Sequence, residues 1–367
     1  MAWIVLIVNP GSTSTKAALY ADEYCLLERT YKHSPDELAQ LSSLEDQLIM
    51  RTNCILQLLV DAEEDKVIQA SQIDIFVGRG GLIGPVKSGI YQVNEEMIAV
   101  LLEERFGSHA SNLGALIVSA LSDRFGKKAY IADPPSVDEF DNLARYTGLP
   151  SIKRRSLFHA LNQKAAAREA AHSFGRSYEQ MNMIVCHMGG GISVAAHRSG
   201  RVIDVNNALE EGPMSPERAG SLPSLSLLDL YSKSKMSVDS FRRTINGHGG
   251  LVAYTGTSDA AELEDQIISN SDYKLALDIM IYQICKEIGS MHAVLQGLTD
   301  VVVLTGGLAR SEYICDSLRR QIGFIAPVSI IPGEREMRAL ACAGIRLLNN
   351  EAASSIYSAA NLQEDYK

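Results

Sequence analysis

Residues 4–20, Ile-Val-Leu-Ile-Val-Asn-Pro-Gly-Ser-Thr-Ser-Thr-Lys-Ala-Ala-Leu-Tyr, decide the fold of this 367-residue chain. The apolar run breaks at a Gly/Ser/Thr turn and resumes after Lys16, which predicts two strands joined by a polar turn. Gly11 allows close backbone approach, the hydroxyl groups can donate hydrogen bonds, and Lys16 adds a positive charge, so the turn is suited to hold phosphate. It is not a Walker A loop, because no second glycine precedes the lysine and a strand follows it. An ordinary hairpin with a polar turn is the alternative.

Similar turns occur twice more in the chain. Residues 184–196, Ile-Val-Cys-His-Met-Gly-Gly-Gly-Ile-Ser-Val-Ala-Ala, again place a turn between apolar runs, and residues 301–309, Val-Val-Val-Leu-Thr-Gly-Gly-Leu-Ala, run from a strand into Gly-Gly. Three such turns over two halves of one chain suggest a duplicated α/β unit with a nucleotide held between the copies. Chance similarity of glycine-containing turns is the alternative.

Composition excludes several classes of protein. A hydrophobic content of 46% with 21% charged residues is typical of a globular protein, and the net charge of -10 argues against nucleic acid or an anionic membrane as partner. The six cysteines are scattered without a Cys-x-x-Cys pair, which argues against a disulfide framework or a zinc site. Without a basic n-region or a membrane-length apolar run, we expect no signal peptide and a cytoplasmic location.

Strands and helices are predicted to alternate in both halves of the chain. The predicted strands lie at 3–8, 16–20, 73–77, 128–132, 183–187, 192–197, 202–205, 301–304 and 328–331. The predicted helices lie at 44–61, 95–105, 111–125, 159–174, 259–269, 274–297, 311–322 and 336–349. The Gly and Pro of Tyr146-Thr-Gly-Leu-Pro150 indicate a boundary. We therefore expect a domain over 1–150, completed by the C-terminal helix at about 337–355, and a second domain over 151–336.

Several further segments carry polar residues that a fold alone does not need. They are Phe76-Val-Gly-Arg-Gly-Gly-Leu-Ile83, Gly107-Ser-His-Ala-Ser-Asn-Leu-Gly114, Ile131-Ala-Asp-Pro-Pro135, Lys153-Arg-Arg-Ser-Leu-Phe-His-Ala-Leu-Asn-Gln-Lys164, Asp204-Val-Asn-Asn207, Glu211-Gly-Pro-Met-Ser-Pro-Glu-Arg-Ala-Gly-Ser-Leu-Pro223 and Ile331-Pro-Gly-Glu-Arg-Glu-Met337. Arginine suits the binding of carboxylates and phosphates in a planar fork. In this order, and together with the opening turn, these segments resemble the short-chain carboxylate kinases of the acetate kinase superfamily, above all its butyrate kinase branch. The resemblance extends from residue 4 to about 347.

This resemblance implies two ribonuclease-H-like α/β domains, as in actin and hexokinase, that bind ATP or ADP with Mg²⁺ in the cleft between them. It also implies a homo-oligomer and a small carboxylate as the partner molecule. The matching motifs assign phosphate-binding roles to Asn9, Ser12, Ser14, Lys16, His187, Gly189, Gly190 and Gly191, and adenosine-binding roles to Gly306 and Gly307. They place Asp133 and Glu336 at the metal, His109 and His159 near the transferred phosphoryl group, and Arg218 at the substrate.

One departure from the acetate kinase pattern concerns an arginine. Those enzymes carry Arg-Val-Val-His-Gly-Gly where this chain has Phe76-Val-Gly-Arg79-Gly-Gly, and we expect Arg79 to supply the missing charge from a shifted position. An ionised carboxylate needs no strong general base, so catalysis by Arg79, Arg218 and His159 would consist of positioning and charge neutralisation, with Asp133 orienting the metal.

The smaller residues Gly78 and Ser108 stand where acetate kinases generally carry bulkier ones, and Phe158 is expected to form another wall of the acyl pocket. The resemblance thus implies reversible phosphorylation of butyrate to butanoyl phosphate. A propionate or branched-chain carboxylate kinase is one alternative, and a non-catalytic ATP-binding switch of the same fold is another.

Several candidate residues have simpler explanations. Asp133 could cap a turn before Pro134, Glu336 could be a solvated first-turn glutamate, and His109 could be an ordinary residue at a helix N-terminus. Lys153-Arg154-Arg155 is expected to be a partly solvated stretch in which only Arg155 could take part, and Asn206-Asn207 is expected to shape a turn.

Overall fold

The computed structural model describes residues 2–41 and 43–362. Its contacts divide the chain into two units, Met1–Asp138 with Arg335–Lys367, and Glu139–Glu334. The sequence placed the corresponding boundaries at 150 and 336. The C-terminal segment belongs with the first unit because its helix packs on the strands of that unit.

The first unit contains a seven-stranded sheet with the order β12-β5-β6-β4-β1-β2-β3. Its strands are β1 (Ile4–Pro10), β2 (Ser14–Ala21), β3 (Tyr24–Lys32), β4 (Ile75–Arg79), β5 (Ile90–Gln92), β6 (Lys128–Ala132) and β12 (Ser354–Ile356). Strands β1, β2 and β3 pair antiparallel, and β1, β4 and β6 pair parallel. Parallel pairing brings the C-terminal ends of β1, β4 and β6 to one edge of the sheet, where the predicted site residues of this unit begin.

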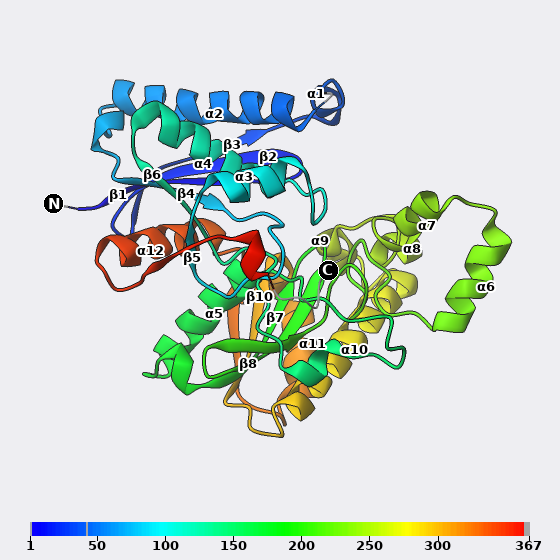
Figure 1. Ribbon diagram of the computed structural model, residues 1–367. Coiled ribbons are helices and arrows are strands. Elements are labelled where there is room, and N and C mark those ends of the chain that lie inside the picture. The colour runs from blue at the N-terminus through cyan, green and yellow to red at the C-terminus, as the bar shows by residue number, and fades with distance from the viewer. Residues whose placement is uncertain (1, 42, 363–367) are drawn as a thin grey trace. The chain divides into compact units, whose positions relative to one another are not determined.

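Helices cover both faces of this sheet. They are α1 (Pro35–Ala39), α2 (Leu44–Glu64), α3 (Glu95–Leu102), α4 (Asn112–Phe125) and α12 (Glu336–Leu348). Helix α2 begins at a capping box formed by Ser43 and Asp46, and α4 ends at the left-handed Gly126. Figure 1 shows α2 and α4 on one face and α12 on the other, where Gly344 packs closely against strand side chains.

The second unit repeats this plan with a five-stranded sheet of order β11-β10-β7-β8-β9. Its strands are β7 (Asn182–Met188), β8 (Ile192–Arg198), β9 (Arg201–Val205), β10 (Val301–Gly306) and β11 (Val328–Pro332). Its helices are α5 (Ala160–Ser173), α6 (Ser224–Ser234), α7 (Val238–Ile245), α8 (Leu251–Thr255), α9 (Ala260–Asp265), α10 (Ser271–Val294) and α11 (Glu312–Ile322).

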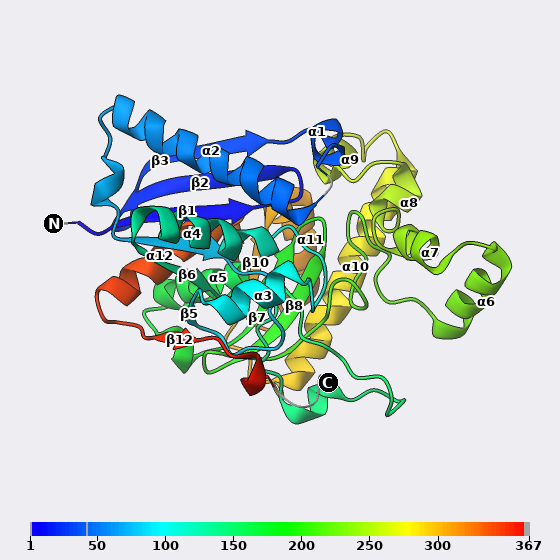
Figure 2. The ribbon, with the colours of Figure 1, turned by 45° about the horizontal axis from the view of Figure 1, so that its top comes forward.

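Side chains of β7 alternate between the two faces of this second sheet. Met183 and Val185 pack with the alanines of α5, whereas Ile184 and Cys186 pack with α10 on the opposite face. Figure 2 shows α5 and α10 beside the strands of this unit. Because a strand alternates its side chains with a period of two, an unbroken apolar run such as this one is buried on both faces.

The two sheets share one strand pattern, which confirms the predicted duplicated α/β fold. The order β3-β2-β1-β4-β6 in the first unit corresponds to β9-β8-β7-β10-β11 in the second, with the same antiparallel and parallel pairs. Each predicted strand and helix is present. Strands β3, β5 and β12 and helices α1, α6, α7 and α8 were not predicted; β3 is mostly exposed and α6 buries no side chain, so hydrophobic periodicity gives little signal there.

Within residues 2–41 and 43–362, no helix is long and apolar enough to cross a membrane.

Candidate active site

The turn between β1 and β2, which the sequence predicts to bind phosphate, is held by a buried arginine. The turn closes with a hydrogen bond from the Gly11 N–H to the Ser14 carbonyl (2.8 Å). The Arg51 guanidinium, from α2, donates to the carbonyl oxygens of Gly11 (2.9 Å), Ser14 (2.8 Å) and Ser12 (3.3 Å). Burial lowers the pKa of Arg51, but a guanidinium keeps its charge in proteins. Arg51 thus neutralises the carbonyl side of the turn, which favours an anion there.

The role of Arg51 was not predicted from the sequence, although the sequence carries a signal for it. Arg51 is 0% exposed and precedes Ile55, Leu58 and Leu59 on the apolar face of α2. A charged residue at such a position is almost always paired. Of the residues assigned to the turn, Asn9 is buried at the end of β1, Ser14 and Lys16 are half-buried in β2, and Ser12 is exposed.

Three predicted site residues of the first unit form one hydrogen-bonded group. Asn9 Nδ2 donates to Glu336 Oε2 (2.8 Å), and Arg79 Nη1 donates to Asn9 Oδ1 (3.3 Å). Arg79 Nη2 lies 3.0 Å from Glu336 Oε1, and Glu336 is only 5% exposed. Glu336 is therefore not a solvated first-turn residue; it binds the arginine at the end of β4 and the asparagine at the end of β1.

Asp133 follows β6 and has a constrained backbone. Its φ is +39°, a conformation that aspartate adopts more readily than most residues. Its Oδ1 accepts hydrogen bonds from the Ser88 hydroxyl (2.6 Å) and the Gly89 N–H (2.9 Å), and the residue is 6% exposed. These contacts fix the direction of a buried carboxylate, and backbone strain of this kind concentrates at functional sites.

Position 78 is a glycine for a structural reason that the sequence did not reveal. The prediction that Gly78 enlarges the acyl pocket has to be corrected. A Cβ atom on Gly78 would lie 2.5 Å from the Gly114 carbonyl oxygen and 3.1 Å from the Val118 side chain. The space beside Gly78 is therefore filled by α4, and the glycine permits close packing of the helix on β4. Ser108 is exposed just before α4, so its proposed role in the pocket is separate from that of Gly78.

His109 is held just before α4. Its Nδ1 accepts a hydrogen bond from the Ser111 N–H (3.2 Å) and lies 2.7 Å from the Ser111 hydroxyl. A backbone N–H can only donate, so Nδ1 accepts and the proton of a neutral ring is on Nε2.

In the second unit, the turn after β7 brings an arginine against the glycines. The turn closes with a hydrogen bond from the Gly189 N–H to the Gly191 carbonyl (3.1 Å), and the Ser215 hydroxyl donates to the Gly190 carbonyl (2.6 Å). A Cβ atom on Gly191 would lie 2.1 Å from Arg218 Nη1. Position 191 is therefore a glycine because the Arg218 guanidinium lies against this backbone. Burial lowers the pKa of Arg218, yet the group remains a cation.

Two predicted histidines lie face to face at the same turn. The rings of His159 and His187 are stacked, with centroids 3.8 Å apart and planes 13° apart. A Cβ atom on Gly189 would lie 3.3 Å from His187 Nε2, so this ring borders the glycine turn after β7. Phe158, directly before His159, is buried at 4% exposure.

The glycines assigned to adenosine lie beside the same turn. Gly306 has a φ of +91°, and a Cβ atom there would lie 2.4 Å from the Met188 carbonyl oxygen, whereas Gly307 borders open space. The short 3-10 turn Gly307–Arg310 leads to a hollow of about 380 Å³. Its lining includes Arg310, Asp316 and Arg319.

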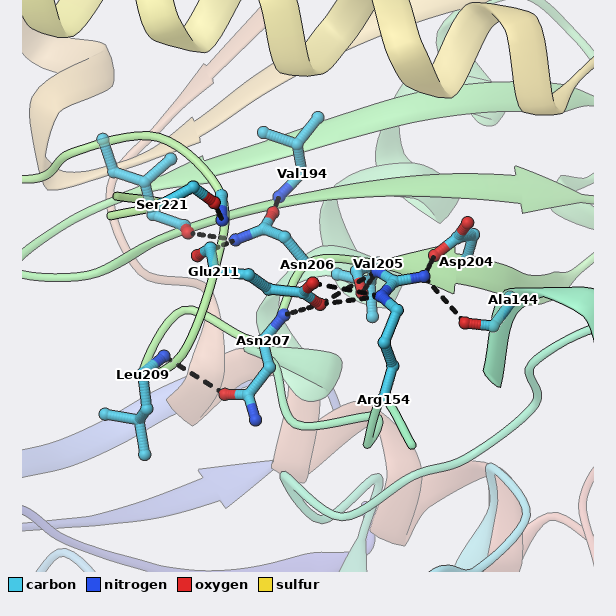
Figure 3. A network of polar contacts seen from close by, with 12 residues as sticks. Ala144, Arg154, Val194, Asp204, Val205, Asn206, Asn207, Leu209, Glu211 and Ser221 are labelled. Atoms are coloured by element: carbon cyan, nitrogen blue, oxygen red, sulfur yellow. Dashed lines mark hydrogen bonds and ion pairs between the residues drawn. The ribbon is translucent and has the colours of Figure 1, made fainter. Parts of the chain in front are cut away.

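Arg154 is a half-buried residue to which the sequence assigned no role, in contrast to Arg155. Figure 3 shows its guanidinium between the carboxylates of Asp204 and Glu211. Arg154 Nη1 donates to Asp204 Oδ1 and to the Ala144 carbonyl (both 2.8 Å), Nε donates to Glu211, and Nη2 donates to the Val205 carbonyl (3.0 Å). Arg155 is exposed and pairs with Glu210 on the surface. The stretch is partly solvated, as expected, but Arg154 within it is half-buried and bound, because its acceptors come from segments distant in sequence.

The Arg154 network supports the loop that holds Arg218. Glu211 Oε1, paired with Arg154, also accepts the Asn207 N–H (3.1 Å), and the Asn207 side chain caps the same loop at Leu209, as Figure 3 shows. Arg218 Nη1 donates to the carbonyl oxygen of Ala208 in this loop (3.2 Å). Arg154 therefore acts on Arg218 through a turn that both residues contact.

This chain is similar to known proteins over nearly its whole length. Residues 147–324 match the Acetokinase family. The chain is 44% identical over 359 residues to butyrate kinase 2 of Clostridium acetobutylicum, a match that covers 97% of this chain and 100% of that protein. It is 43% identical to a probable butyrate kinase of Listeria innocua, a match that also covers 97% of this chain and 100% of that protein.

Solved structures share the fold. Acetate kinase from Porphyromonas gingivalis superposes with a TM-score of 0.79 at 21% identity, covering 95% of this chain and 100% of that chain. A propionate kinase from Francisella tularensis superposes with a TM-score of 0.73 at 16% identity, covering 93% of this chain and 98% of that chain.

Proposed function

This chain belongs to the acetokinase family, and we propose that it transfers the γ-phosphoryl group of ATP to butyrate, reversibly, giving butanoyl phosphate and ADP. A carboxylate oxygen of butyrate forms the new bond to the γ-phosphorus, the bond from that phosphorus to the bridging oxygen breaks, and the electron pair stays on the β-phosphate of ADP. No proton has to move, because the nucleophile is already ionised at neutral pH.

The contact between Arg218 and the glycine turn carries this proposal. A guanidinium against Gly191 supports binding of the anionic acceptor or the transferred group beside a phosphate turn. The His159 and His187 pair at the same turn adds ring donors for the phosphoryl oxygens. A protein that merely binds ATP as a switch needs the phosphate turns but has no use for this arginine.

In the first unit, we assign Arg79 to the substrate carboxylate or the phosphoryl oxygens. Glu336 and Asn9 orient its guanidinium. Both oxygens of Glu336 are engaged by these two residues, so we assign Glu336 to positioning Arg79 rather than to direct metal binding.

The carboxylate of Asp133 suits Mg²⁺, because this ion binds through one or two carboxylates together with water and substrate phosphates. Among residues 2–41 and 43–362, no three His, Cys, Asp or Glu side chains are grouped as metal ligands, and a magnesium site of this kind does not need such a group. Asp133, with one oxygen fixed by Ser88 and Gly89, would hold the ion directly or through water. When bound, Mg²⁺ neutralises charge on the phosphate oxygens.

The preference for a four-carbon acid rests on the relatives and on the small side chain of Ser108, which we assign to the acyl pocket. A methylene group contributes about 1–3 kcal/mol in such a pocket, so propionate and branched acids remain the alternative substrates. A homo-oligomer and a cytoplasmic location stay predictions, which light scattering and cell fractionation would check.

Trapping of acyl phosphate with hydroxylamine tests the activity. The full chain is incubated with ATP, Mg²⁺ and a series of acids from acetate to valerate, while ATP binding is measured by calorimetry. Maximal product with butyrate supports the proposal, and a maximum at propionate or isobutyrate keeps the reaction and changes the substrate. ATP binding without acyl phosphate from any acid refutes the kinase in favour of the switch.

A matched pair of variants tests the role of Arg218. We expect Arg218→Met to lower kcat/KM at least a hundredfold, whereas Arg155→Met, which removes a surface arginine of the same unit, changes it less than threefold. Equal effects of the two substitutions would contradict the assignment.

A further inference from the structure

Two consecutive residues of α5, Asn162 and Gln163, hold the stacked histidines. Each does so through a chain of hydrogen bonds that begins at a backbone carbonyl and leads to one histidine ring. Both residues are 0% exposed. A carbonyl oxygen can only accept a hydrogen bond, so each chain has a defined direction, and the tautomer of each ring follows from it.

The chain to His159 begins at the Ser193 carbonyl. Gln163 Nε2 lies 2.9 Å from this carbonyl oxygen and 2.8 Å from Ser193 Oγ, so the amide nitrogen faces Ser193 and donates to both atoms. Ser193 Oγ lies 2.9 Å from His159 Nδ1 and is fully buried. Its hydroxyl proton goes to Nδ1, because a buried hydroxyl without an acceptor costs about 1–3 kcal/mol. The proton of the His159 ring is therefore on Nε2.

The chain to His187 begins at the Gly333 carbonyl. The Thr305 hydroxyl donates to that carbonyl (3.3 Å), so its oxygen accepts from Asn162 Nδ2 (3.3 Å). The same amide nitrogen lies 2.7 Å from His187 Nδ1 and donates to it. His187 Nδ1 thus accepts, and the ring proton is on Nε2, the atom that borders Gly189.

The contact of the Gln163 amide oxygen with His197 agrees with this orientation of the amide. Gln163 Oε1 lies 3.1 Å from His197 Nε2, which therefore carries the proton, and His197 Nδ1 accepts from the Tyr178 hydroxyl (2.7 Å). Burial, and then the charges of Lys164 and Arg168, hold the pKa of His197 well below its usual range. A neutral His197 with one donor and one acceptor satisfies every link of the chain.

We propose that Asn162 and Gln163 are positioning residues that lock His187 and His159 as neutral Nε2–H tautomers, so that two stacked rings present fixed N–H donors to the phosphoryl group. This inference rests on the proposed function. Two charged rings 3.8 Å apart would repel each other by about 4 kcal/mol at an effective dielectric constant of 20, whereas two neutral rings stack without this cost. Because the transfer requires no proton, fixed neutral donors aimed at the developing charge are what the reaction needs.

Nitrogen-15 NMR of the full-length protein labelled at histidine tests the proposal directly. Long-range ¹H–¹⁵N spectra distinguish the Nε2–H tautomer, the Nδ1–H tautomer and the imidazolium, and His159→Gln and His187→Gln assign the two signals. We expect both rings of the wild type to be Nε2–H at pH 7.5. An Nδ1–H ring or an imidazolium at either position overturns the proposal, and this measurement needs no variant to fold other than the two used for assignment.

A crossed pair of variants tests each chain separately. Gln163→Glu removes the donor to Ser193, so we expect the His159 signal to change to Nδ1–H or imidazolium and the His187 signal to stay. Asn162→Asp should change the His187 signal and leave the His159 signal as it is. Tyr178→Phe, which lies one hydrogen bond further from the stacked rings, should leave both signals unchanged. We also expect Gln163→Glu to lower kcat at least tenfold with little change in the KM for ATP.

The two proposals fail in different ways. A folded Gln163→Glu protein with an unchanged His159 signal overturns the positioning role. Spectra as expected, with no acyl phosphate from any acid, keep the tautomers and refute the kinase.

Discussion

Replacing Arg154 by methionine removes the cation at the centre of a carboxylate cluster in the second unit. The Arg154 side chain is 20% exposed, and the side chains of its partners Asp204 and Glu211 are 12% and 28% exposed. Burial raises the pKa of Glu287 to about 7, and the nearby charge of Glu211 adds to this effect. Burial also raises the pKa of Asp204 against the pull of Arg154. Without Arg154, these carboxyl groups lose the positive charge that lies among them.

Breaking a buried ion pair by removing one partner costs about 3–5 kcal/mol, and the partial exposure of this cluster places the expected loss near the lower end. For a domain of about 200 residues, each kcal/mol lowers Tm by about 2–4 °C, so Arg154→Met should lose roughly 10 °C. A carboxyl group whose pKa is raised on folding binds a proton as the chain folds, so its ionisation destabilises the folded state as pH rises. The loss should therefore be smaller at pH 5 than at pH 8.

Thermal unfolding followed by calorimetry at pH 5, 6.5 and 8 measures this loss. The control is Arg155→Met, which breaks an exposed pair with Glu210 and should cost less than about 1 kcal/mol at every pH. A loss below 1 kcal/mol for Arg154→Met, or a loss equal at pH 5 and pH 8, would refute the electrostatic argument.

Three further changes have defined outcomes. Glu287→Gln should be more stable than wild type by up to about 3 kcal/mol at pH 8 and by much less at pH 5, since its folded pKa of about 7 lies above the ordinary 4.5; denaturant titrations that give equal differences at both pH values contradict this. Gly114→Ala would place a Cβ atom 2.1 Å from the Arg79 carbonyl oxygen, so we expect a loss of about 3 kcal/mol and a raised KM for butyrate. Gly148→Ala is the control, because open space surrounds Gly148: it should change the stability by no more than about 0.5 kcal/mol and the KM for butyrate by no more than about twofold. Ser108→Leu should lower the butyrate-to-acetate ratio of kcat/KM at least fivefold, and an unchanged ratio in steady-state assays removes this residue from the pocket.

Sequence periodicity was sufficient for the elements that are buried on a regular pattern. The two apolar runs around residues 9–16 and 187–193 became paired strands with glycine-containing turns, as predicted, because strand pairing across a short turn is a local event. The exposed β3 and α6 were missed, since their residues form regular structure without a buried face that would mark it.

Motif order was enough to place candidate residues on turns and strand ends, but it could not assign partners to them. That Glu336 binds Arg79 depends on α12 returning to the first sheet from the end of the chain. That Gly78 packs against Gly114 depends on the distance between a helix and a strand, which no local pattern records.

The sequence by itself therefore determined the duplicated α/β plan, the positions of the glycine-containing turns and the family, because these depend on local periodicity and on short motifs. Only the tertiary structure decided which charged side chains are buried and paired. Arg51 is buried and Arg154 is half-buried, and both lie in stretches that give no local sign of their acceptors. Each is stable there because distant segments bring carbonyl or carboxylate oxygens to it. The same physical reason applies to the histidine tautomers, which are set by hydrogen bonds to carbonyls that become neighbours only when the sheet and α5 pack together.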